Sequence, residues 1–347
     1  MFHLSYNMLN RGDTMMIPLF RRCHAVTAFI MAAAAIPAAA QAPADAAAGY
    51  PAHPIRVIAP IPPGGSGDLV TRRVTGAAAE VLGQPMVVDN RPGATGNIGM
   101  VAAAKAPADG YTIVLCSFGP CSVNSSLYPN TGFDVQKDFA PIILVGASMN
   151  VLTVNPATGI RSVKDLLERA RKPGAPLAYG SSGVGASNHL GAEWLKLAAK
   201  VEMTHVPFKG SGPAITDLIA GHIQVFFDNE PSILPQIKAG KVVAIAVTGK
   251  SRSANLPDVP TMEEAGFPGF VIEPWYAFAA PAGTPEPMIR RLNAAFAEAL
   301  AKPALRQSLT ESGIRTIGGT PQDLDRHLRA EAARWAEVIK AQNIKAE

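Results

Sequence analysis

The sequence predicts an α/β fold that is divided into two lobes with a cleft between them. From residue 55 onward, short apolar runs alternate with amphipathic segments, which is typical of βαβ units on a largely parallel sheet. These runs are too many for one compact sheet, and 347 residues suit two domains of about 150 residues each. Hydrophobic residues at 48% and charged residues at 17% are typical of a globular protein.

In the first part of the chain, strand-like runs and helix-like segments are joined by turns rich in Gly and Pro. The predicted strands cover residues 55–59, 86–89 and 112–116. The predicted helices cover residues 68–82 and 98–104. The loop at residues 60–67 and the turn at residues 90–96 connect these elements.

The same alternation continues past residue 141. The predicted strands cover residues 151–154, 177–179, 203–206, 225–227 and 242–247, and residues 275–280 are apolar and extended. The predicted helices cover residues 163–171, 188–199, 214–220, 233–239, 286–301 and 321–341. Ser162 is a candidate N-cap for the first of them, because a serine side chain accepts hydrogen bonds from the first helical turn.

Residues 1–42 have the order of a secretory signal peptide. Two arginines at 21–22 precede an apolar run at 25–36, and small residues follow up to Ala42. This order predicts export, with cleavage after Ala40 or Ala42. A transmembrane anchor is the alternative, but the run is shorter than the roughly 20 apolar residues that a span needs.

Two further details concern the start of the exported chain and its cysteines. Met15 and Met16 lie closer to the arginines than Met1 does, so we expect translation to start at one of them. Cys116 and Cys121 remain after cleavage, and an oxidising compartment allows a disulfide between them. Two unpaired cysteines in a core are the alternative.

The charge of the chain argues against nucleic-acid binding. The formal net charge is +4, but residues 1–40 contribute three arginines and one aspartate, so the rest carries +2. The charges are scattered, without a Lys/Arg stripe or interleaved aromatics, so no nucleic-acid partner is expected.

Three loops follow predicted strands, open predicted helices and are rich in Gly and Ser. They cover residues 62–68, 117–124 and 180–188, and a Gly-rich turn at 91–99 also precedes a helix. A helix start exposes free N–H groups with about half a positive charge, and Gly lets a ligand approach the backbone. Such loops bind anions without Arg or Lys, and open α/β sheets bind ligands at this end of their strands.

Side chains in these loops modify the predicted anion site. Ser66, Ser117, Ser181 and Ser182 add hydroxyl donors. Asp68 supports the dipole of its helix but repels an anion unless its carboxylate points away. Any one of these loops is explained equally well as an ordinary turn. The presence of several such loops in one chain favours a binding site. No loop matches a phosphate or dinucleotide motif.

Catalytic motifs are missing from the sequence. The string GSSG at 180–183 does not match the nucleophile elbow G-x-S-x-G, and nothing in the sequence links His189 or His205 to a serine. H-E-x-x-H and C-x-x-C are both absent, so no metal site and no cofactor are expected. A periplasmic serine hydrolase is a remote alternative, and the chain is predicted not to be an enzyme.

A series of motifs from residue 54 onward carries a resemblance to a known family. They are PIRV (54–57), PIPPGG (60–65), NRPGA (90–94), GNIG (96–99), DGYT (109–112), DFAP (138–141), YGSSG (179–183), HVPFKG (205–210), FDN (227–229), AVTG (246–249), LPDVPT (256–261), APAGTP (280–285) and GGTP (318–321). In this order they resemble the substrate-binding proteins of tripartite tricarboxylate transporters, often called the Bug family.

The resemblance implies a type II periplasmic-binding-protein fold, in which two α/β lobes joined by two crossing strands close on a ligand. Lobe 1 is expected at residues 50–149 plus 271–347, and lobe 2 at residues 150–270. The implied function is capture of a small carboxylate, which is a dicarboxylate, tricarboxylate, aromatic acid or acidic amino acid. Membrane permease subunits are the implied partners, and the protein is expected to be a monomer. A ligand-sensing co-receptor for a two-component histidine kinase is the alternative.

The resemblance also implies which residues bind the ligand, through the PGG loop of lobe 1 and the SSG loop of lobe 2. Together with the loop side chains, the candidates are Ile61, Pro63, Gly64, Gly65, Ser66, Asp68, Ser117, Phe118, Ser181, Ser182, Gly183, Asp228 and Asn229.

Three features depart from the family pattern. Gly67 lies where Thr is common, and Ile61 replaces a frequent Phe or Tyr. Phe118 lies with Cys116 and Cys121 in a loop that is usually small and polar, and the family does not generally carry a disulfide there. Phe118 either narrows the pocket, stacks on an aromatic ligand or packs within its lobe.

Overall fold

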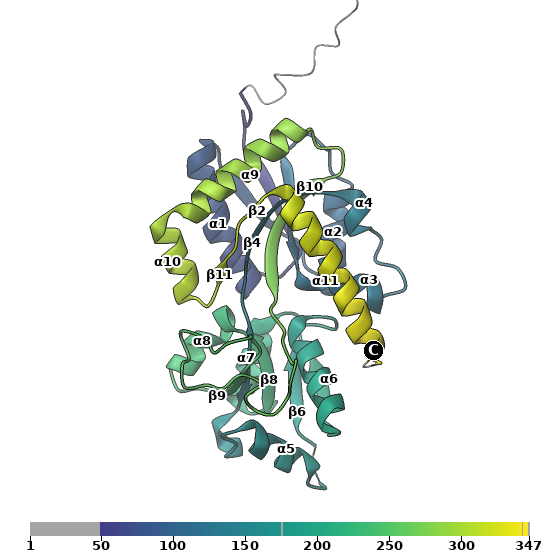
Figure 1. Ribbon diagram of the computed structural model, residues 1–347, viewed down its shortest axis with the longest axis vertical. Helices are drawn as coiled ribbons and strands as arrows, with labels where there is room; N and C mark the ends of the chain where they lie inside the picture. Colours follow the sequence, from purple (N-terminus) through teal and green to yellow (C-terminus); the bar gives the residue numbers. More distant parts are fainter. Residues whose placement is uncertain (1–48, 175, 342, 346–347) are drawn as a thin grey trace, which may run out of the picture. The chain divides into compact units, whose positions relative to one another are not determined.

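The computed structural model describes residues 49–174, 176–341 and 343–345, which contain two β-sheets (Figure 1). The predicted signal peptide, its cleavage site and the alternative start codons lie outside the described residues. Across the described residues, no helix combines the length and the apolar character that crossing a membrane requires.

The first sheet, which defines lobe 1, has six strands in the order β11-β4-β10-β3-β1-β2. Its strands are β1 (Ile55–Ala59), β2 (Met86–Asn90), β3 (Thr112–Ser117), β4 (Phe139–Ala147), β10 (Trp275–Pro281) and β11 (Arg315–Thr316). Its helices are α1 (Ser66–Leu82), α2 (Asn97–Ala104), α3 (Asn124–Leu127), α4 (Val135–Asp138), α9 (Glu286–Ala301), α10 (Pro303–Glu311) and α11 (Pro321–Ala341), with short helical turns at Ala94–Gly96 and Gly119–Val123.

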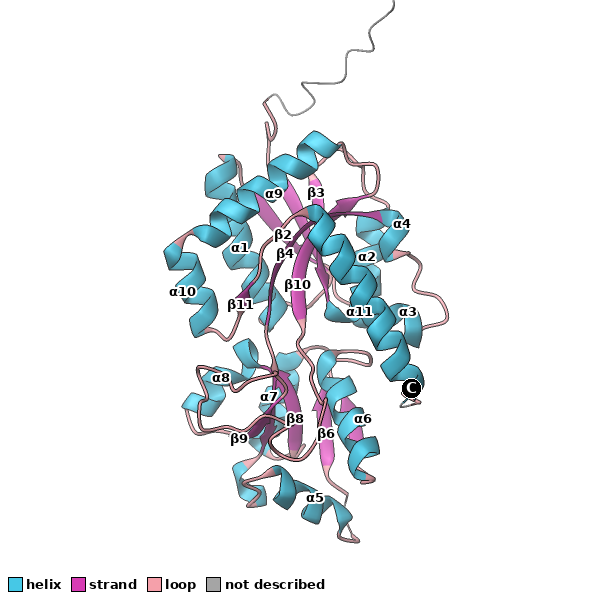
Figure 2. Ribbon diagram, in the orientation of Figure 1, coloured by secondary structure: helices cyan, strands magenta, loops and turns pink. Residues whose placement is uncertain are grey.

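The second sheet, which defines lobe 2, has five strands in the order β7-β6-β8-β5-β9 (Figure 2). Its strands are β5 (Asn150–Val154), β6 (Ala178–Ser181), β7 (Thr204–Pro207), β8 (Val225–Asn229) and β9 (Val243–Val247). Its helices are α5 (Val163–Arg171), α6 (Ser187–Ala199), α7 (Ser211–Ala220) and α8 (Glu230–Lys238), with a short helical turn at Pro156–Thr158.

Both sheets are covered on their two faces, and neighbouring side chains of a strand therefore enter different cores. In β1, Val57 packs in the cluster that includes α1 and α9, whereas Ile58 packs in the cluster that includes α2 and α11. In β8, Phe226 faces α7 and α8, whereas Phe227 packs in the cluster that includes α6. This two-residue alternation is the one that a pleated strand imposes.

The prediction of largely parallel sheets was wrong, because both sheets are mixed. Strands β1, β2 and β3 pair in parallel, as do β6, β7 and β8. Strand β10 pairs antiparallel with β3 and β4, and β5 pairs antiparallel with β8 and β9. The antiparallel pairs arise where the chain passes between the lobes and enters each sheet in the opposite direction.

The two segments that cross between the lobes are hydrogen-bonded to each other. The first connects β4 to β5, and the second runs from β9 to β10. The Ser148 N–H donates to the Pro274 carbonyl at 2.8 Å. The Thr248 hydroxyl accepts from the Asn150 N–H at 2.9 Å and donates to the Ile272 carbonyl at 2.6 Å. These bonds tie both crossing segments together where the lobes meet.

Candidate functional site

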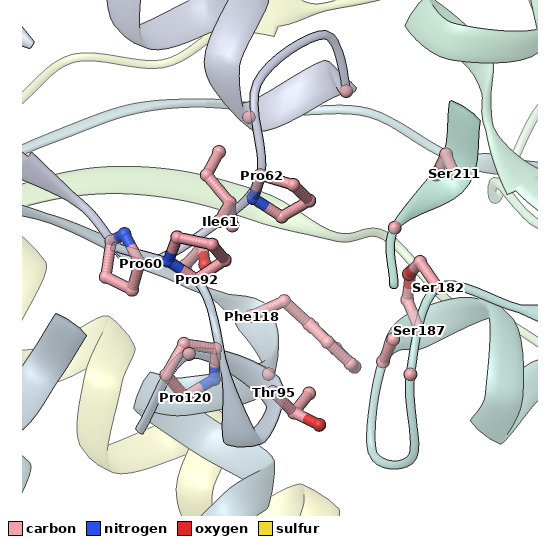
Figure 3. A pocket seen from close by; sticks show the side chains of 18 of the residues that line it. Pro60, Ile61, Pro62, Pro92, Thr95, Phe118, Pro120, Ser182, Ser187 and Ser211 are labelled. Carbon is pink, nitrogen blue, oxygen red and sulfur yellow. The ribbon is translucent and has the colours of Figure 1, made fainter. Parts of the chain in front are cut away.

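A cavity of about 630 Å³ lies between the two lobes (Figure 3). Lobe 1 contributes the loops that follow β1, β2 and β3, together with residues 274–276. Lobe 2 contributes the loops that follow β6 and β7, together with Asn229 at the end of β8. The walls therefore consist of segments at the carboxyl ends of strands, where the sequence predicted a binding site.

Four helices begin at this cavity. Helix α1 follows Gly65, α6 follows Ala186, α7 follows Gly210 and α8 follows Asn229, and all four preceding residues line the cavity. Within the described residues, none of these four starts is capped by a side chain. Backbone N–H groups at such starts lack helical acceptors and carry partial positive charge.

Helix α5 shows what a capped start looks like in the same lobe. The Ser162 hydroxyl accepts from the Asp165 N–H at 3.1 Å, which confirms the predicted N-cap. In α1, by contrast, the first helical hydrogen bond runs from the Leu69 N–H to the Gly65 carbonyl at 3.0 Å. The N–H groups of Ser66 and Gly67 precede that bond and lie at the cavity wall, where they can donate to an anion.

The charges around the cavity also favour an anion. Among its described lining residues, Lys209 is the only side chain with a full charge, and no Asp or Glu lines it. The described residues also contain no cluster of three or more His, Cys, Asp or Glu that could hold a metal ion.

Asp68 faces away from the cavity. Its carboxylate accepts from the Gly64 N–H at 3.1 Å, Arg72 Nε at 3.0 Å and Asn90 Nδ2 at 3.0 Å. Burial raises the pKa of Asp68, but the hydrogen bonds from Arg72, Asn90 and Gly64 outweigh it and lower that pKa below the usual value. The acid is thus neutralised by Arg72 and does not oppose an anion at the start of α1.

Asp228 lies behind the polar wall of lobe 2. The side chain is fully buried, and its Oδ1 accepts from the Ser211 hydroxyl at 2.7 Å. Burial raises the pKa of Asp228 to about 7 despite the hydrogen bonds that favour its ionised form. A buried acid therefore orients Ser211, which lines the cavity, without lining it itself.

Ser181 is bonded to a histidine that the sequence did not connect to any serine. The Ser181 hydroxyl lies 2.7 Å from His205 Nε2, on the neighbouring strand β7. Ser181 is fully buried and does not line the cavity, and His205 stacks on Tyr179. The contact arises from the pairing of β6 with β7, which no local motif in the sequence indicates.

Eight of the candidate ligand-binding residues line the cavity and five do not. Those at the wall are Ile61, Gly65, Ser66, Ser117, Phe118, Ser182, Gly183 and Asn229. Pro63 and Gly64 are exposed, whereas Asp68, Ser181 and Asp228 are buried behind the wall. Successive residues point to opposite sides of a strand, so Asn229 reaches the cavity and Asp228 does not.

The candidate residues did not include the other lining residues, although many of these lie in the four predicted loops, and only Pro60, Tyr128, residues 208–211 and residues 274–276 lie outside them. The other lining residues are Pro60, Pro62, Gly67, residues 92–96, Gly119, Pro120, Tyr128, Val184, Ala186, Ser187, residues 208–211 and residues 274–276. The segment at 208–211 follows β7 and opens α7, so it repeats the strand, loop and helix order that marked the other loops. Gly210 followed by Ser211 was the available signal.

Two departures from the family pattern are neighbours in space. A Cβ added at Gly67 would lie 2.7 Å from Ile61 Cδ1, which is closer than van der Waals contact allows. Ile61 therefore fills the space that a side chain at position 67 would need. The two residues together shape the wall at the start of α1.

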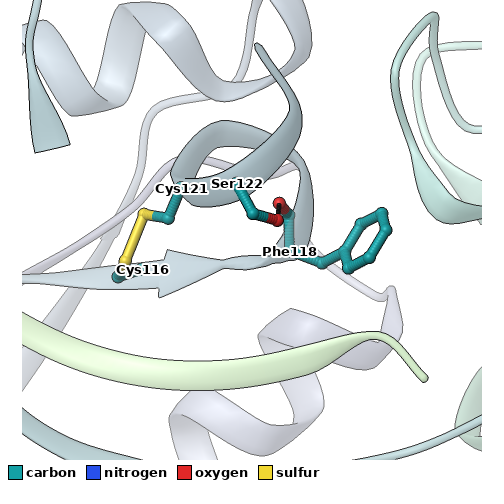
Figure 4. Close-up of a disulfide and its surroundings, with 4 residues drawn as sticks. All are labelled: Cys116, Phe118, Cys121 and Ser122. Carbon is teal, nitrogen blue, oxygen red and sulfur yellow. Dashed lines mark hydrogen bonds between the residues drawn. A yellow bond between two sulfur atoms is a disulfide. The ribbon is translucent and has the colours of Figure 1, made fainter. Parts of the chain in front are cut away.

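The loop after β3 is closed by a disulfide between Cys116 and Cys121, whose Cα atoms lie 5.8 Å apart (Figure 4). The four residues between them all line the cavity. The Ser122 hydroxyl donates to the Phe118 carbonyl at 2.6 Å, and the Phe118 ring packs edge-on against Trp335 at 4.9 Å between centroids. Figure 4 shows the Phe118 ring pointing away from the sulfurs.

Hydrogen bonds connect the two walls at several places around the cavity. The hydroxyls of Ser66 and Ser232 are bonded to each other across the lobes. Asn229 Nδ2 donates to the Tyr276 hydroxyl at 3.3 Å, and the Tyr128 hydroxyl donates to the Val184 carbonyl at 3.1 Å. The lobes are therefore in direct contact around the space that they enclose.

Comparisons with known proteins agree with this architecture. The family model described as "Tripartite tricarboxylate transporter family receptor" matches residues 70–344. Protein BugT of Bordetella pertussis is 38% identical over 292 residues, which cover 84% of this chain and 90% of BugT.

Two solved structures from Rhodopseudomonas palustris are similar throughout. One, a protein with adipate, is 37% identical with a TM-score of 0.83, covering 85% of this chain and 99% of that one. The other, MatC with bound malate, is 31% identical with a TM-score of 0.80, covering 84% of this chain and 100% of that one. The predicted two-lobed fold is confirmed.

The sequence motifs, the fold and the relatives thus agree, and the predicted resemblance is confirmed. The family is one of solute-binding receptors, which confirms that the chain is not an enzyme. We conclude that the chain belongs to the tripartite tricarboxylate transporter receptors, the Bug family of periplasmic solute-binding proteins.

Proposed function

We propose that this protein captures a small organic acid by a carboxylate group and delivers it to the membrane permease subunits of a tripartite transporter. The observation that carries the proposal is the meeting of three open helix starts, those of α1, α6 and α7, at one cavity that no described acidic side chain lines. At the fourth start, that of α8, the Glu230 N–H already donates to the Met149 carbonyl, and Pro231 has no N–H. Backbone N–H groups at helix starts bind carboxylates.

In this proposal both lobes contribute donors to the carboxylate. Lobe 1, residues 50–149 and 271–347, supplies the backbone from Gly65 to Gly67. Lobe 2, residues 150–270, supplies the backbone N–H groups at the start of α7 and the Lys209 ammonium. The hydroxyls of Ser182 and Ser211 already donate to Asn188 and Asp228 and can only accept. Because the donors belong to different lobes, a bound carboxylate stabilises the arrangement in which the lobes are in contact.

The relatives support the carboxylate class without identifying the ligand. The R. palustris structures contain adipate and malate, and both molecules carry carboxylates. Their carboxylates are the feature that a cavity built from helix starts would recognise.

Isothermal titration calorimetry of the purified exported protein tests this function. We expect binding by at least one acid from a panel of aliphatic, aromatic and amino acids, each compared with its carboxamide. The amide has nearly the same shape but no charge, so it should bind at least about tenfold more weakly. Equal affinities of an acid and its amide would contradict the anion site. Absence of binding by every acid of the panel would refute the proposed function.

Uptake measurements separate transport from sensing. In a strain that lacks this gene, we expect uptake of the labelled acid to fall. Unchanged uptake with lost induction of a target operon would instead favour a co-receptor for a histidine kinase. N-terminal sequencing of the exported protein checks the predicted cleavage after Ala40 or Ala42.

A further inference from the structure

The two ends of the cavity differ in the hydrogen-bonding groups that they offer. The first, the amide end, consists of Pro62, residues 65–67, residues 209–211 and Asn229. The second, the far end, consists of residues 92–96, Pro120, Tyr128 and Val184. Figure 3 shows Pro62 and Ser211 on one side of Phe118, and Pro120 and Thr95 on the other.

Contacts between the lobes place the members of each end together. At the amide end, a Cβ added at Gly210 would lie 2.7 Å from the Pro62 ring. At the far end, the Tyr128 hydroxyl bonds to the Val184 carbonyl, and a Cβ added at Gly96 would lie 2.9 Å from the Pro120 ring. Each end is thus a distinct cluster, and Phe118 lies between them.

The hydroxyl donors of the far end are already used. The Tyr128 hydroxyl donates its proton to the Val184 carbonyl at 3.1 Å. Thr95 Oγ1 lies 3.2 Å from the same hydroxyl, so Thr95 must be the donor in that contact. Neither hydroxyl has a proton left for a ligand, although both retain acceptor capacity.

The backbone donors at the start of α2, beside the far end, are used as well. The Gly96 N–H donates to the Gly93 carbonyl at 2.9 Å, and the Asn97 N–H donates to the Ala94 carbonyl. The Ile98 N–H also reaches the Gly93 carbonyl at 3.5 Å. The start of α2 is therefore satisfied by the turn that precedes it, unlike the starts of α1 and α7.

The remaining surface near the far end is apolar. Pro92, Pro120 and Val184 present hydrocarbon to the cavity, and Phe118 lies beside them. None of the described lining residues at this end is charged. Burial of an apolar group here is favourable in free energy, because the group leaves water. A carboxylate here would lose its hydration and face hydrogen-bond acceptors, which is unfavourable.

On the basis of the function proposed above, we infer that the ligand is a monocarboxylate with an apolar tail. Its carboxylate binds at the amide end, and its tail lies along Phe118 toward the far end. A second carboxylate at the distal position is selected against, because it would meet neither a cation nor an open helix start there. The preference of this cavity therefore differs from that for the dicarboxylates seen in the R. palustris structures.

Matched pairs of acids test this inference by calorimetry on the purified exported protein. The pairs are butyrate with succinate, hexanoate with adipate, and octanoate with suberate, in which a terminal methyl replaces the second carboxylate. Within the pair that binds best, we expect the monocarboxylate to bind at least about tenfold more tightly. Equal or tighter binding of the dicarboxylate would overturn the inference and leave the proposed function intact. Absence of binding by every acid in these pairs, when another acid of the wider panel binds, would overturn the inference alone.

A variant of the far end gives an independent readout. Thr95→Lys places a cation there, whereas Thr95→Gln has a similar length without charge and serves as the matched control. We expect the lysine variant to shift the adipate-to-hexanoate affinity ratio by at least about tenfold toward adipate, and the glutamine variant to shift it much less. The same ratio in both variants would mean that the distal group lies elsewhere, and the inference would fail.

Discussion

The two walls of the cavity are built from different chemistry. The lobe 1 wall is lined by five prolines and Phe118, beside polar residues such as Thr95 and Ser117, and a disulfide closes one of its loops. The lobe 2 wall presents the side chains of Ser182, Ser187, Ser211, Asn229 and Lys209. Lobe 1 thus supplies the proline-rich surface, and lobe 2 supplies the one charged side chain among the described lining residues. Changes in lobe 2 should alter binding of every acid, whereas changes in lobe 1 should alter the choice among them.

The largest effect is expected from a charge placed in the polar wall. Ser211→Asp brings a carboxylate to the ligand's own carboxylate, and two unit charges about 4 Å apart repel by about 4 kcal/mol near a protein surface. Every acid that binds the unchanged protein should lose about 1,000-fold in affinity by calorimetry. An acid near a helix start favours folding of α7, whereas repulsion from the neighbouring Asp228 opposes it, so the free energy of unfolding of the variant is measured alongside.

Ser211→Ala is the matched control for that variant. It removes the hydroxyl that donates to Asp228 and leaves the charge of the wall unchanged, so affinity should fall by about tenfold at most. Similar losses in both variants would show that Ser211 acts by its shape and not at an anion site.

Asp228, behind the same wall, should make stability depend on pH. Its pKa is about 7 in the folded protein against an ordinary value of 3.8, so the folded state retains a proton that the unfolded state releases. Stability should therefore fall as pH rises from about 4 to about 7 and level off above that. Asp228→Asn should remove this fall, which is about 4 kcal/mol for a shift of about three pKa units.

Urea unfolding across this pH range measures the effect. The free energy of unfolding of Asp228→Asn, relative to the unchanged protein, should rise between pH 4 and pH 8. A difference that stays constant with pH would show that Asp228 titrates normally in the folded state.

A smaller effect is expected from the disulfide of the apolar wall. Replacing both Cys116 and Cys121 by Ala should lower the free energy of unfolding by about 2 kcal/mol, because the closed loop is short. The same variant should lower the affinity for hexanoate more than the affinity for adipate, since Phe118 belongs to this loop. Equal weakening of both acids would contradict a role for lobe 1 in selection.

The smallest effect should come from Lys209, which is exposed. Lys209→Gln should lower the affinity for each acid only about threefold, because an exposed charge interacts weakly through water. The difference should vanish at about 0.5 M salt. A loss that persists in high salt would indicate a direct, desolvated contact with the ligand.

The sequence predicted the elements whose pattern is local. The alternation of strands and helices, the Ser162 cap and three of the cavity loops follow from neighbouring residues. Strand β4 was not predicted, and it contains Pro141, a residue that is unusual inside a sheet. In the structure, β11 pairs with β4 only at Gly146 and Ala147, so Pro141 lies where that edge of β4 has no β11 partner. Whether β4 can contain a proline depends on where the distant strand β11 pairs with it, and the residues next to Pro141 do not show this.

The site was predicted in outline but not in the orientation of its side chains. Ser181 and Ser182 read alike in the sequence, yet only Ser182 lines the cavity, because Ser181 points toward His205. Trp275 and Tyr276 were predicted only as an extended segment. They reach the cavity because the second crossing segment returns to lobe 1 there. Which residues meet across the lobes depends on the tertiary arrangement.

The prolines of the lobe 1 wall have a consequence for how binding is driven. Pro60, Pro62, Pro92 and Pro120 each have a locked φ angle, and the disulfide restrains the loop that carries Pro120. The conformational entropy of this wall is therefore lost once, when the chain folds. A ligand that arrives later has little backbone left to order on that side, so more of its contact energy is retained as affinity.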